Sequence, residues 1–242
     1  MPALLKNFKF ALTDFSKLAM TPTNRWNRPI GRLLAVALLS LPGLAAAQTS
    51  AQAKVSPAPV ILIVGDSLSA EYGLKRGTGW VALLEKQLVS EKKNARVINA
   101  SISGDTTSGG RSRLPALLAQ HQPATVVIEL GGNDALRGLP LNMSEKNLSA
   151  MTQAAKKSGA KVLLVGMQVP PNYGAAYGAS FAALFTNIAT AEKVAVVPFF
   201  LKGIGDTADA TANFQPDRIH PNEQSQARML ANVWPELKKL IK

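Results

Sequence analysis

The chain has 242 residues, of which 47% are hydrophobic and 17% charged, a composition typical of a globular protein and unlike that of a disordered or fibrous one. It contains no cysteine and two histidines, which excludes disulfides, a cysteine nucleophile and a multi-histidine metal centre. The formal net charge is +12, but the basic residues are scattered and lack interleaved aromatic residues, so nucleic-acid binding is not indicated.

Residues 1–47 have the order of segments found in secretory signal peptides. Arg25, Arg28 and Arg32 precede an uncharged apolar run at 33–44, and small residues follow it up to Ala47. The run is too short to span a bilayer, although a signal anchor that stays attached is the alternative interpretation. We predict cleavage near Ala47 and export to the periplasm or the outside.

The segment ahead of the three arginines is longer than a signal peptide needs, so translation starts at either Met1 or Met20. After the predicted cleavage, 21 basic and 14 acidic residues remain, a net charge of +7, which favours weak attraction to anionic surfaces or substrates. Residues 48–58 are rich in Ala, Gln, Ser and Pro and are expected to form a flexible tail. The folded domain is predicted to be residues 59–242.

Within this domain, short apolar runs alternate five times with segments of helical periodicity. This alternation predicts an α/β fold, a parallel sheet covered by helices on both faces. We expect strands at residues 61–65, 96–100, 125–130, 161–165 and 194–197. We expect helices around residues 80–88, 114–118, 144–158 and 181–188, and after Pro221.

Glycine and proline predict several boundaries in the chain. The glycine-rich stretch at 101–110 is expected to be a loop without regular structure. Pro115 should limit how far the helix at 114–118 extends backwards, and Pro235 should kink or divide the last helix. Gly131 and Gly132 predict a turn after the third strand.

Four polar clusters lie where strands end or where the last helix is approached. They are Gly65-Asp66-Ser67, Ser103-Gly104-Asp105, Gly132-Asn133-Asp134 and the segment from Asp217 to His220. Because parallel strands end at one edge of a sheet, residues far apart in sequence can meet there.

The residue types in these clusters suit nucleophilic catalysis. Ser67 could attack a carbonyl if His220 removes its proton, and Asp217 lies three residues away, where it could orient the imidazole. Backbone N–H groups near Gly104 and the amide of Asn133 could donate to the developing oxyanion. The other histidine, His121, precedes a strand and is expected at the opposite edge.

Each cluster also has an ordinary interpretation. The segment from Asp217 to His220 could cap the last helix, and Gly132-Asn133-Asp134 could be a simple turn. The loop from Ser103 to Gly110 could bind phosphate, although it lacks the lysine and spacing of a P-loop. If there is no catalytic site, each of these non-catalytic interpretations must be correct at the same time, although all four clusters lie where a site would need them.

The four clusters resemble the conserved blocks of the SGNH (GDSL) hydrolases. The resemblance extends to residues 99–106, 113–118, 129–134 and 171–174, which look like the periplasmic thioesterase, lysophospholipase and arylesterase branch of that family. It covers nearly everything after Pro59.

This resemblance implies a three-layer αβα sandwich of the flavodoxin-like type, with strand order 2-1-3-4-5. It implies a triad of Ser67, Asp217 and His220, and an oxyanion hole from the N–H groups of Ser67 and Gly104 and the amide of Asn133. In relatives, the loop that corresponds to residues 169–174 moves on acyl binding and helps to select the acyl chain. The substrate-binding residues implied here are Pro171, Asn172, Tyr173 and Gly174.

One departure is Glu71, which occupies a position where relatives usually carry glycine and would put a carboxylate near the mouth of the site. The predicted function is hydrolysis of acyl esters and thioesters without a metal or other cofactor, by a monomer that makes transient contact with lipid or a membrane surface. Two alternatives remain open, a polysaccharide O-deacetylase with the same residues and a non-catalytic flavodoxin-like binding module.

Overall fold

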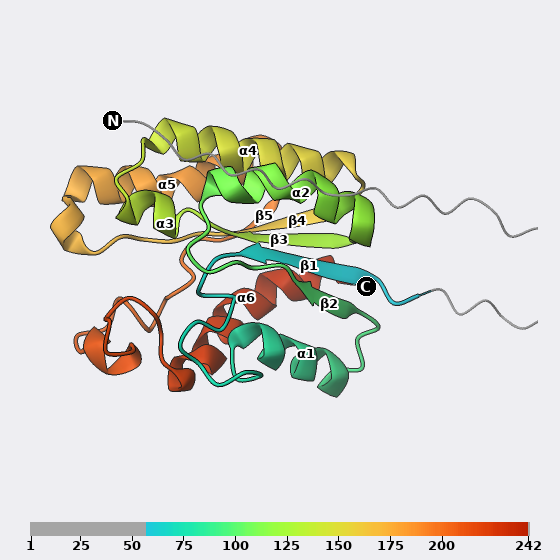
Figure 1. The fold of residues 1–242 in the computed structure, drawn as a ribbon, viewed down its shortest axis with the longest axis horizontal. Coiled ribbons are helices and arrows are strands. Elements are labelled where there is room, and N and C mark those ends of the chain that lie inside the picture. The colour runs from blue at the N-terminus through green and yellow to red at the C-terminus, as the bar shows by residue number, and fades with distance from the viewer. Residues whose placement is uncertain (1–56, 242) are drawn as a thin grey trace, which may run out of the picture. The chain divides into compact units, whose positions relative to one another are not determined.

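The computed structural model describes residues 57–241, so the predicted signal peptide and most of the predicted tail lie outside the described residues. Strands and helices alternate along this part of the chain (Figure 1). The strands are β1 (Val60–Gly65), β2 (Arg96–Asn99), β3 (Thr125–Glu129), β4 (Lys161–Val165) and β5 (Ala195–Val197). The α-helices are α1 (Trp80–Ser90), α2 (Thr107–His121), α3 (Gly132–Leu136), α4 (Leu141–Lys157), α5 (Ala175–Glu192) and α6 (Gln226–Leu240).

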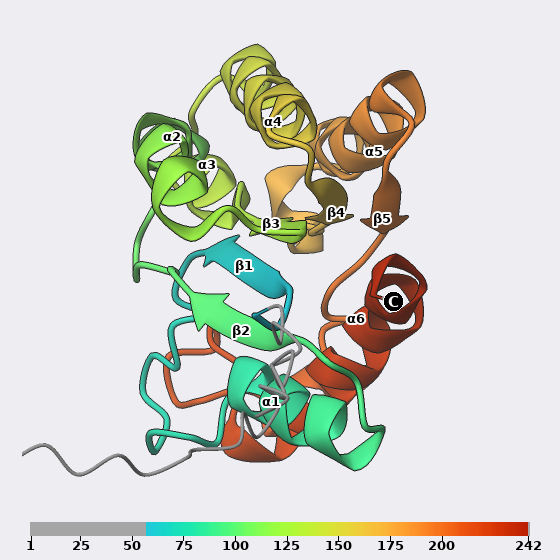
Figure 2. The same ribbon diagram turned by 90° about the vertical axis from the view of Figure 1, so that its right-hand side faces the viewer.

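All five strands are parallel and lie in the order β2-β1-β3-β4-β5, which confirms the predicted topology. Strand β1 is an interior strand, with Ile63 paired to Asn99 of β2 on one side and to Val127 of β3 on the other. Figure 2 shows the three layers, with α1 and α6 on one face of the sheet and α2, α4 and α5 on the other. The loops that follow the strands therefore leave from one edge, here called the carboxyl edge.

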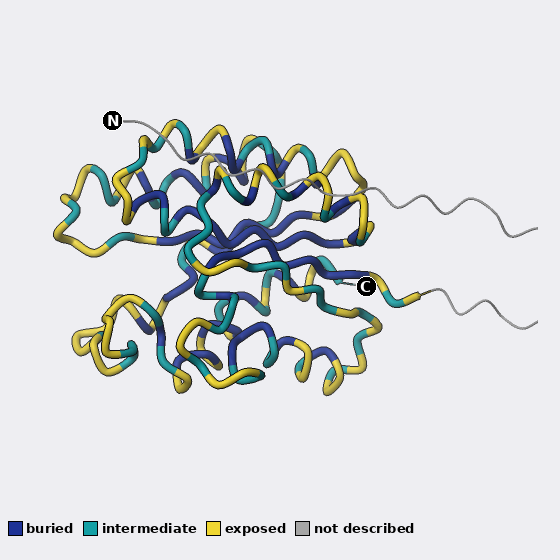
Figure 3. The backbone as a smooth tube through the Cα atoms, in the orientation of Figure 1, coloured by how far each residue is buried: buried dark blue, intermediate teal, exposed yellow. Residues whose placement is uncertain are grey.

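The core lies between the sheet and its two helix layers, where the central strands are buried along their whole length (Figure 3). Strand β1 is buried at all six positions, as expected of an apolar run covered by helices on both faces. Trp80, Phe181, Phe185 and Phe200 are the largest fully buried side chains. Burial of one large apolar side chain stabilises the fold by roughly 1.5–3 kcal/mol, so the sheet is a rigid base for the loops at its edge.

Helix α2 is longer than predicted and includes part of the expected loop. It begins at Thr107 because Oγ1 of Thr106 accepts a hydrogen bond from the N–H of Gly109, an N-cap that the glycine-rich composition obscured. Pro115 lies inside the helix, eight residues from its start. The carbonyl that loses its partner there belongs to Arg111, which is exposed and can bind water instead.

The predictions for the last helix were also wrong in detail. Pro221 does not open it; a 3-10 turn at Glu223–Ser225 comes first, capped by Asn222, and α6 starts at Gln226. Pro235 lies within α6 without dividing it.

The predicted turn after β3 is the short helix α3, which carries Asn133 and Asp134. Within residues 57–241, we find no helix with the length and apolar character needed to cross a bilayer.

Candidate active site

The turn after β1 holds Ser67 at the carboxyl edge. The Asp66 side chain closes this turn, since its Oδ1 accepts a hydrogen bond from the backbone N–H of Leu68 at 3.0 Å. Glycine is needed at position 65, because a Cβ there would lie 2.7 Å from the carboxyl group of Glu129. These contacts hold the turn without using the Ser67 hydroxyl, which stays free for another partner.

That partner is His220. Its Nε2 lies 2.9 Å from Oγ of Ser67, and its Nδ1 lies 2.6 Å from Oδ2 of Asp217. The other carboxylate oxygen of Asp217 accepts the backbone N–H groups of Ile219 at 3.0 Å and His220 at 3.1 Å. With Nδ1 donating to the carboxylate, Nε2 is left as the acceptor for the serine hydroxyl.

The surroundings of Asp217 keep it ionised. Desolvation acts to raise the pKa of Asp217, but the hydrogen bonds from the Ile219 N–H, the His220 ring and the His220 N–H outweigh it and lower that pKa to about 2. The carboxylate can therefore stabilise a positive charge on the imidazole at any pH above this value.

Two of the three predicted oxyanion donors, Asn133 and Gly104, belong to segments that are hydrogen-bonded to the nucleophile turn or to the end of β1. Asn133, on α3, donates from Nδ2 to Oδ2 of Asp66 at 3.0 Å, which uses one of the two N–H groups of its amide. The loop of Gly104 reaches β1 through a hydrogen bond from the N–H of Ile102 to the carbonyl of Gly65 at 3.1 Å. Gly104 has φ +79°, a left-handed conformation that favours glycine.

An exposed arginine joins these two donors. Arg137 follows Asn133 by one helical turn, and its Nη2 donates to the carbonyl of Gly104 at 2.8 Å. A buried contact supports the same junction, since Oδ2 of Asp134 accepts the N–H of Thr107 at 2.9 Å. The loop after β2 and the start of α3 are thus fixed to each other at two points.

A pair of buried carboxyl groups lies beneath the nucleophile turn. Glu129 accepts hydrogen bonds from Oγ of Ser69 at 2.7 Å and from the N–H of Asp66 at 3.3 Å, and Nε1 of Trp80 donates to the same serine at 3.1 Å. Burial raises the pKa of Asp66 to about 6. Burial, together with the neighbouring Asp66 carboxylate, raises the pKa of Glu129 well above its ordinary value.

The ring of Tyr72 lies against the imidazole ring of His220. Its ring centroid lies 4.4 Å from that of His220, with the two planes inclined by 37°. The backbone of Tyr72 is held by Gln215, whose Nε2 donates to its carbonyl at 2.9 Å. An aromatic face at this distance can attract a positive charge placed next to it.

The expectation for Glu71 is corrected by the structure. Its carboxylate does not project into the mouth of the site, because it accepts the backbone N–H groups of Gly77 at 3.0 Å and Gly79 at 2.8 Å. Residue 71 has φ +60°, which explains why glycine also suits this position. Glu71 therefore braces the loop that carries Tyr72.

The segment Pro171, Asn172, Tyr173 and Gly174 forms a 3-10 turn at Pro171–Tyr173 between β4 and α5. Its aromatic contact is with α5, where the rings of Tyr173 and Tyr177 stack at 6.2 Å. Neither a hydrogen bond nor an aromatic contact within residues 57–241 joins this segment to Ser67 or His220. The structure places it on the carboxyl edge, between β4 and α5.

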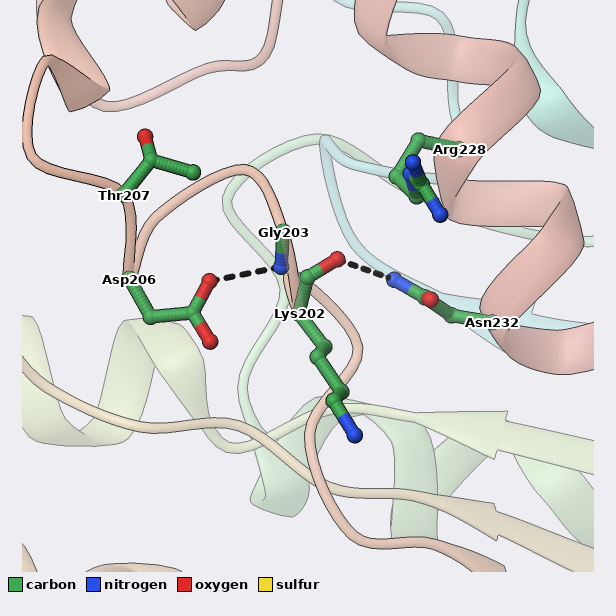
Figure 4. Close-up of a pocket in the computed structure, with 6 residues that line it drawn as sticks. All are labelled: Lys202, Gly203, Asp206, Thr207, Arg228 and Asn232. Atoms are coloured by element: carbon green, nitrogen blue, oxygen red, sulfur yellow. Dashed lines mark hydrogen bonds between the residues drawn. The ribbon is translucent and has the colours of Figure 1, made fainter.

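A surface pocket lies away from these residues (Figure 4). It is lined by Lys202, Gly203, Asp206, Thr207, Arg228 and Asn232. Its polar groups are used locally, with Asp206 accepting the N–H of Gly203 and Asn232 donating to the carbonyl of Lys202. None of the residues that line it belongs to the Ser67 cluster, so we assign it no part in the chemistry.

Sequence reasoning missed the roles of Glu129, Trp80, Tyr72 and Arg137. A signal existed for Glu129, because a lone acidic residue inside an apolar strand must be buried with partners or neutralised. No signal could have paired Tyr72 with His220 or Arg137 with Gly104, since each contact joins segments far apart in sequence.

Comparison with known proteins identifies the family. A model described as the GDSL-like Lipase/Acylhydrolase family matches residues 63–228, a span that includes Ser67, Asn133, Asp217 and His220. The chain belongs to this family. The resemblance to the GDSL hydrolases is therefore confirmed, and with it the identification of the chain as a hydrolase of that group.

Two relatives and one solved structure give the match more detail. Esterase TesA of Pseudomonas aeruginosa is 51% identical over 206 residues, covering 85% of this chain and 96% of the relative. Thioesterase 1/protease 1/lysophospholipase L1 of Escherichia coli K12 is 41% identical over 188 residues, covering 78% of this chain and 88% of the relative. A crystal structure of TesA has a TM-score of 0.72 at 53% identity, covering 75% of this chain and 99% of that one, which confirms the fold.

Proposed function

We propose that this GDSL-family hydrolase is a serine esterase that cleaves acyl esters and thioesters, with Ser67 as nucleophile, His220 as general base and Asp217 as the orienting carboxylate. The proposal depends on one observation, the continuous hydrogen-bonded chain from Ser67 Oγ to His220 at 2.9 Å and from His220 to Asp217 at 2.6 Å. This is the arrangement that activates a serine hydroxyl. The names of the relatives, esterase and thioesterase, support both substrate classes.

In the proposed reaction, Oγ of Ser67 attacks the acyl carbonyl while Nε2 of His220 takes the hydroxyl proton. The carbonyl oxygen becomes an oxyanion that accepts from the N–H groups of Ser67 and Gly104 and from the amide of Asn133. Collapse breaks the bond to the alcohol or thiol, which leaves with the proton from His220, and an acyl-serine remains. Water then attacks this acyl group with the same residues, releasing the acid and restoring Ser67.

Two further parts of the proposal concern substrate and location. Pro171, Asn172, Tyr173 and Gly174 lie on the carboxyl edge at the end of β4, where they could contact an acyl chain seated on Ser67. We also propose that the protein is exported after removal of residues 1–47, because these residues have the pattern of a signal peptide. We propose that it acts as a monomer, because the net charge of +7 on the remaining residues opposes self-association.

The test is Ser67→Ala assayed on short p-nitrophenyl esters, with Ser90→Ala, an exposed serine at the far end of α1, as the matched control. We expect Ser67→Ala to lose at least 10³-fold in kcat with little change in Tm, and Ser90→Ala to match the parent. Full residual activity in Ser67→Ala would end the proposal. A panel of aryl ester, acyl-CoA, lysophospholipid and acetylated xylan separates this function from O-deacetylation of polysaccharide.

A further inference from the structure

The exposed apolar side chains of the described residues are concentrated around the candidate active site. Five large hydrophobic residues are exposed, and four of them, Tyr72, Ile102, Leu136 and Ile219, lie on loops or a short helix at the carboxyl edge. Each of the four shows about half of its surface to solvent, between 47% and 53%. The fifth, Val89, lies near the end of α1, which runs back to the opposite edge.

Contacts tie each of these four residues to the Ser67 site. Tyr72 packs on the ring of His220, and Ile219 directly precedes that histidine. Ile102 is held by a backbone hydrogen bond to Gly65, two residues before Ser67. We call Tyr72, Ile102, Leu136 and Ile219 the apolar rim.

Leu136 joins the apolar rim through its neighbour, because Arg137 donates to the carbonyl of Gly104. The four residues come from four separate connections, those after β1, β2, β3 and β5. They therefore lie on four different connections at the edge of the sheet that carries Ser67. Single exposed hydrophobic residues are common on protein surfaces, but four on the connections at one edge indicate a contact surface.

Basic residues accompany the apolar rim. Arg137 follows Leu136 and Arg218 precedes Ile219, while Lys75 and Arg76 are exposed in the same loop as Tyr72. These four cations add positive charge to an opening that is otherwise apolar.

The acidic residues near the apolar rim in sequence are held by local contacts, but one of them alone is neutralised by a cation. Asp105 forms an ion pair with Arg113 at 2.8 Å, Asp217 is bonded to His220, and Glu71 accepts backbone N–H groups. Glu223, after His220, is exposed, and two further acids, Asp206 and Asp209, are bonded within their own loop. The charge beside the apolar rim is therefore mixed, with the four cations Lys75, Arg76, Arg137 and Arg218 all exposed to solvent.

Apolar side chains flanked by lysine and arginine are the pattern of proteins that bind at the surface of anionic lipid layers. We propose that the apolar rim and the basic residues Lys75, Arg76, Arg137 and Arg218 dock onto the surface of anionic lipid membranes or micelles. The inference rests on the proposed function in one respect: docking would bring the opening at Ser67 to ester bonds at that surface.

The test measures binding to vesicles, independently of catalysis. Protein is recovered from cells that express the full chain, and its intact mass establishes that every variant has the same N-terminus. Sedimentation with sucrose-loaded vesicles compares pure phosphatidylcholine with an equal mixture of phosphatidylglycerol and phosphatidylcholine. We expect the parent to partition at least about 25-fold more strongly onto the mixture, since each basic residue near an anionic surface contributes about fivefold.

Two double variants test the two components of the surface. Ile102→Ser with Leu136→Ser should reduce binding to the mixed vesicles at least fivefold, and Lys75→Ser with Arg76→Ser should reduce it by about 25-fold, fivefold for each charge. The matched controls are Val89→Ser, the exposed hydrophobic residue at the other edge, and Lys86→Ser with Lys146→Ser, exposed cations on α1 and α4. Both controls should bind like the parent.

The readouts separate docking from chemistry. Ser67→Ala should bind vesicles like the parent, and both rim variants should keep parental kcat/KM on a short, water-soluble p-nitrophenyl ester. Equal binding to both vesicle types, or equal losses in rim and control variants, would overturn the docking proposal. A change in the sedimentation mass of the rim variants without lipid would also overturn it, because the surface would then be an interface between copies of the chain.

Discussion

The carboxyl groups of Asp217 and Asp66 flank the same serine turn but lie in opposite surroundings. The Asp217 side chain is 35% exposed, pairs with a histidine ring and has a pKa lowered to about 2. Asp66 is buried above Glu129, accepts from Asn133, and has a pKa raised by burial to about 6. Asp217 is therefore charged across the whole range near neutral pH, whereas Asp66 is half protonated at about pH 6.

This difference assigns the two regions to different roles, activity for the Asp217 loop and stability for the buried pair of Asp66 and Glu129. The surface loop from Asp217 to His220 supplies charge and a proton acceptor, yet its few contacts contribute little to folding. The buried pair of Asp66 and Glu129 supplies no attacking group, but it holds the nucleophile turn and the Asn133 amide together. If this division is correct, substitutions in the two regions should affect activity and stability in opposite proportions.

The largest expected effect is on activity at the surface loop. Asp217→Asn keeps the acceptor for the Ile219 and His220 N–H groups but loses the charge opposite the imidazole, so kcat should fall by about 10³- to 10⁴-fold. Tm should change by less than about 2 °C. The control is Asp206→Asn, a neighbouring loop carboxylate bonded only to backbone N–H, which should leave kcat unchanged. Equal kcat values for the two variants would contradict a catalytic role for the Asp217 carboxylate.

The second effect is on stability at the buried pair. Glu129→Ala leaves a cavity and removes the acceptor of Ser69 and Asp66, so the free energy of unfolding should drop by about 4 kcal/mol. Glu129→Gln keeps the volume and an acceptor oxygen and should cost less than about 1 kcal/mol, because burial, which raises the pKa of Glu129, favours an uncharged group at this position. Urea unfolding measures both, and similar losses in the two variants would contradict this role for Glu129.

The third effect is the pH dependence of stability due to Asp66. Its pKa is raised from 3.8 to about 6 on folding, so its contribution is complete below pH 3.8 and is lost as the pH rises through 6. This shift corresponds to about 3 kcal/mol. The difference in unfolding free energy between the parent and Asp66→Asn should therefore shrink by about 3 kcal/mol between pH 4 and pH 7.5. A difference that stays constant with pH would show that Asp66 ionises normally.

The smallest effect sharpens the comparison within the surface region. Tyr72→Leu removes the ring that faces His220 and should lower kcat about two- to sixfold, the size of a partly exposed cation–π contact. Tyr72→Phe keeps the ring and should retain parental kcat. If both variants lose activity equally, the phenol hydroxyl rather than the ring face is what matters.

Much of the fold could be predicted from the sequence because β1, β3 and β4 are each built on a run of consecutive apolar residues, as a sheet buried on both faces requires. The starts of α2 and α6 could not, because the Thr106 N-cap lies in a glycine-rich stretch and a 3-10 turn separates Pro221 from α6. Local sequence does not report whether a helix continues through an internal proline such as Pro115 or Pro235.

The candidate site was predictable to a different degree in its two regions. Asp217 and His220 lie three residues apart, so their pairing could be inferred from spacing, and the structure brings them to Ser67. The partnership of Asp66 with Asn133 spans 67 residues and depends on how β1 and β3 pair in the sheet. Contacts of that kind become visible only when the strand order and register are known.

The central claim is that Ser67 is an activated nucleophile, and covalent labelling tests it most directly. The parent protein is treated with a fluorophosphonate, and the adduct is located by peptide mass spectrometry. We predict one adduct per chain on Ser67, formed at the parental rate in Glu129→Gln and far more slowly in Asp217→Asn. An adduct on another residue, or no adduct on Ser67 in the folded parent, would contradict the account.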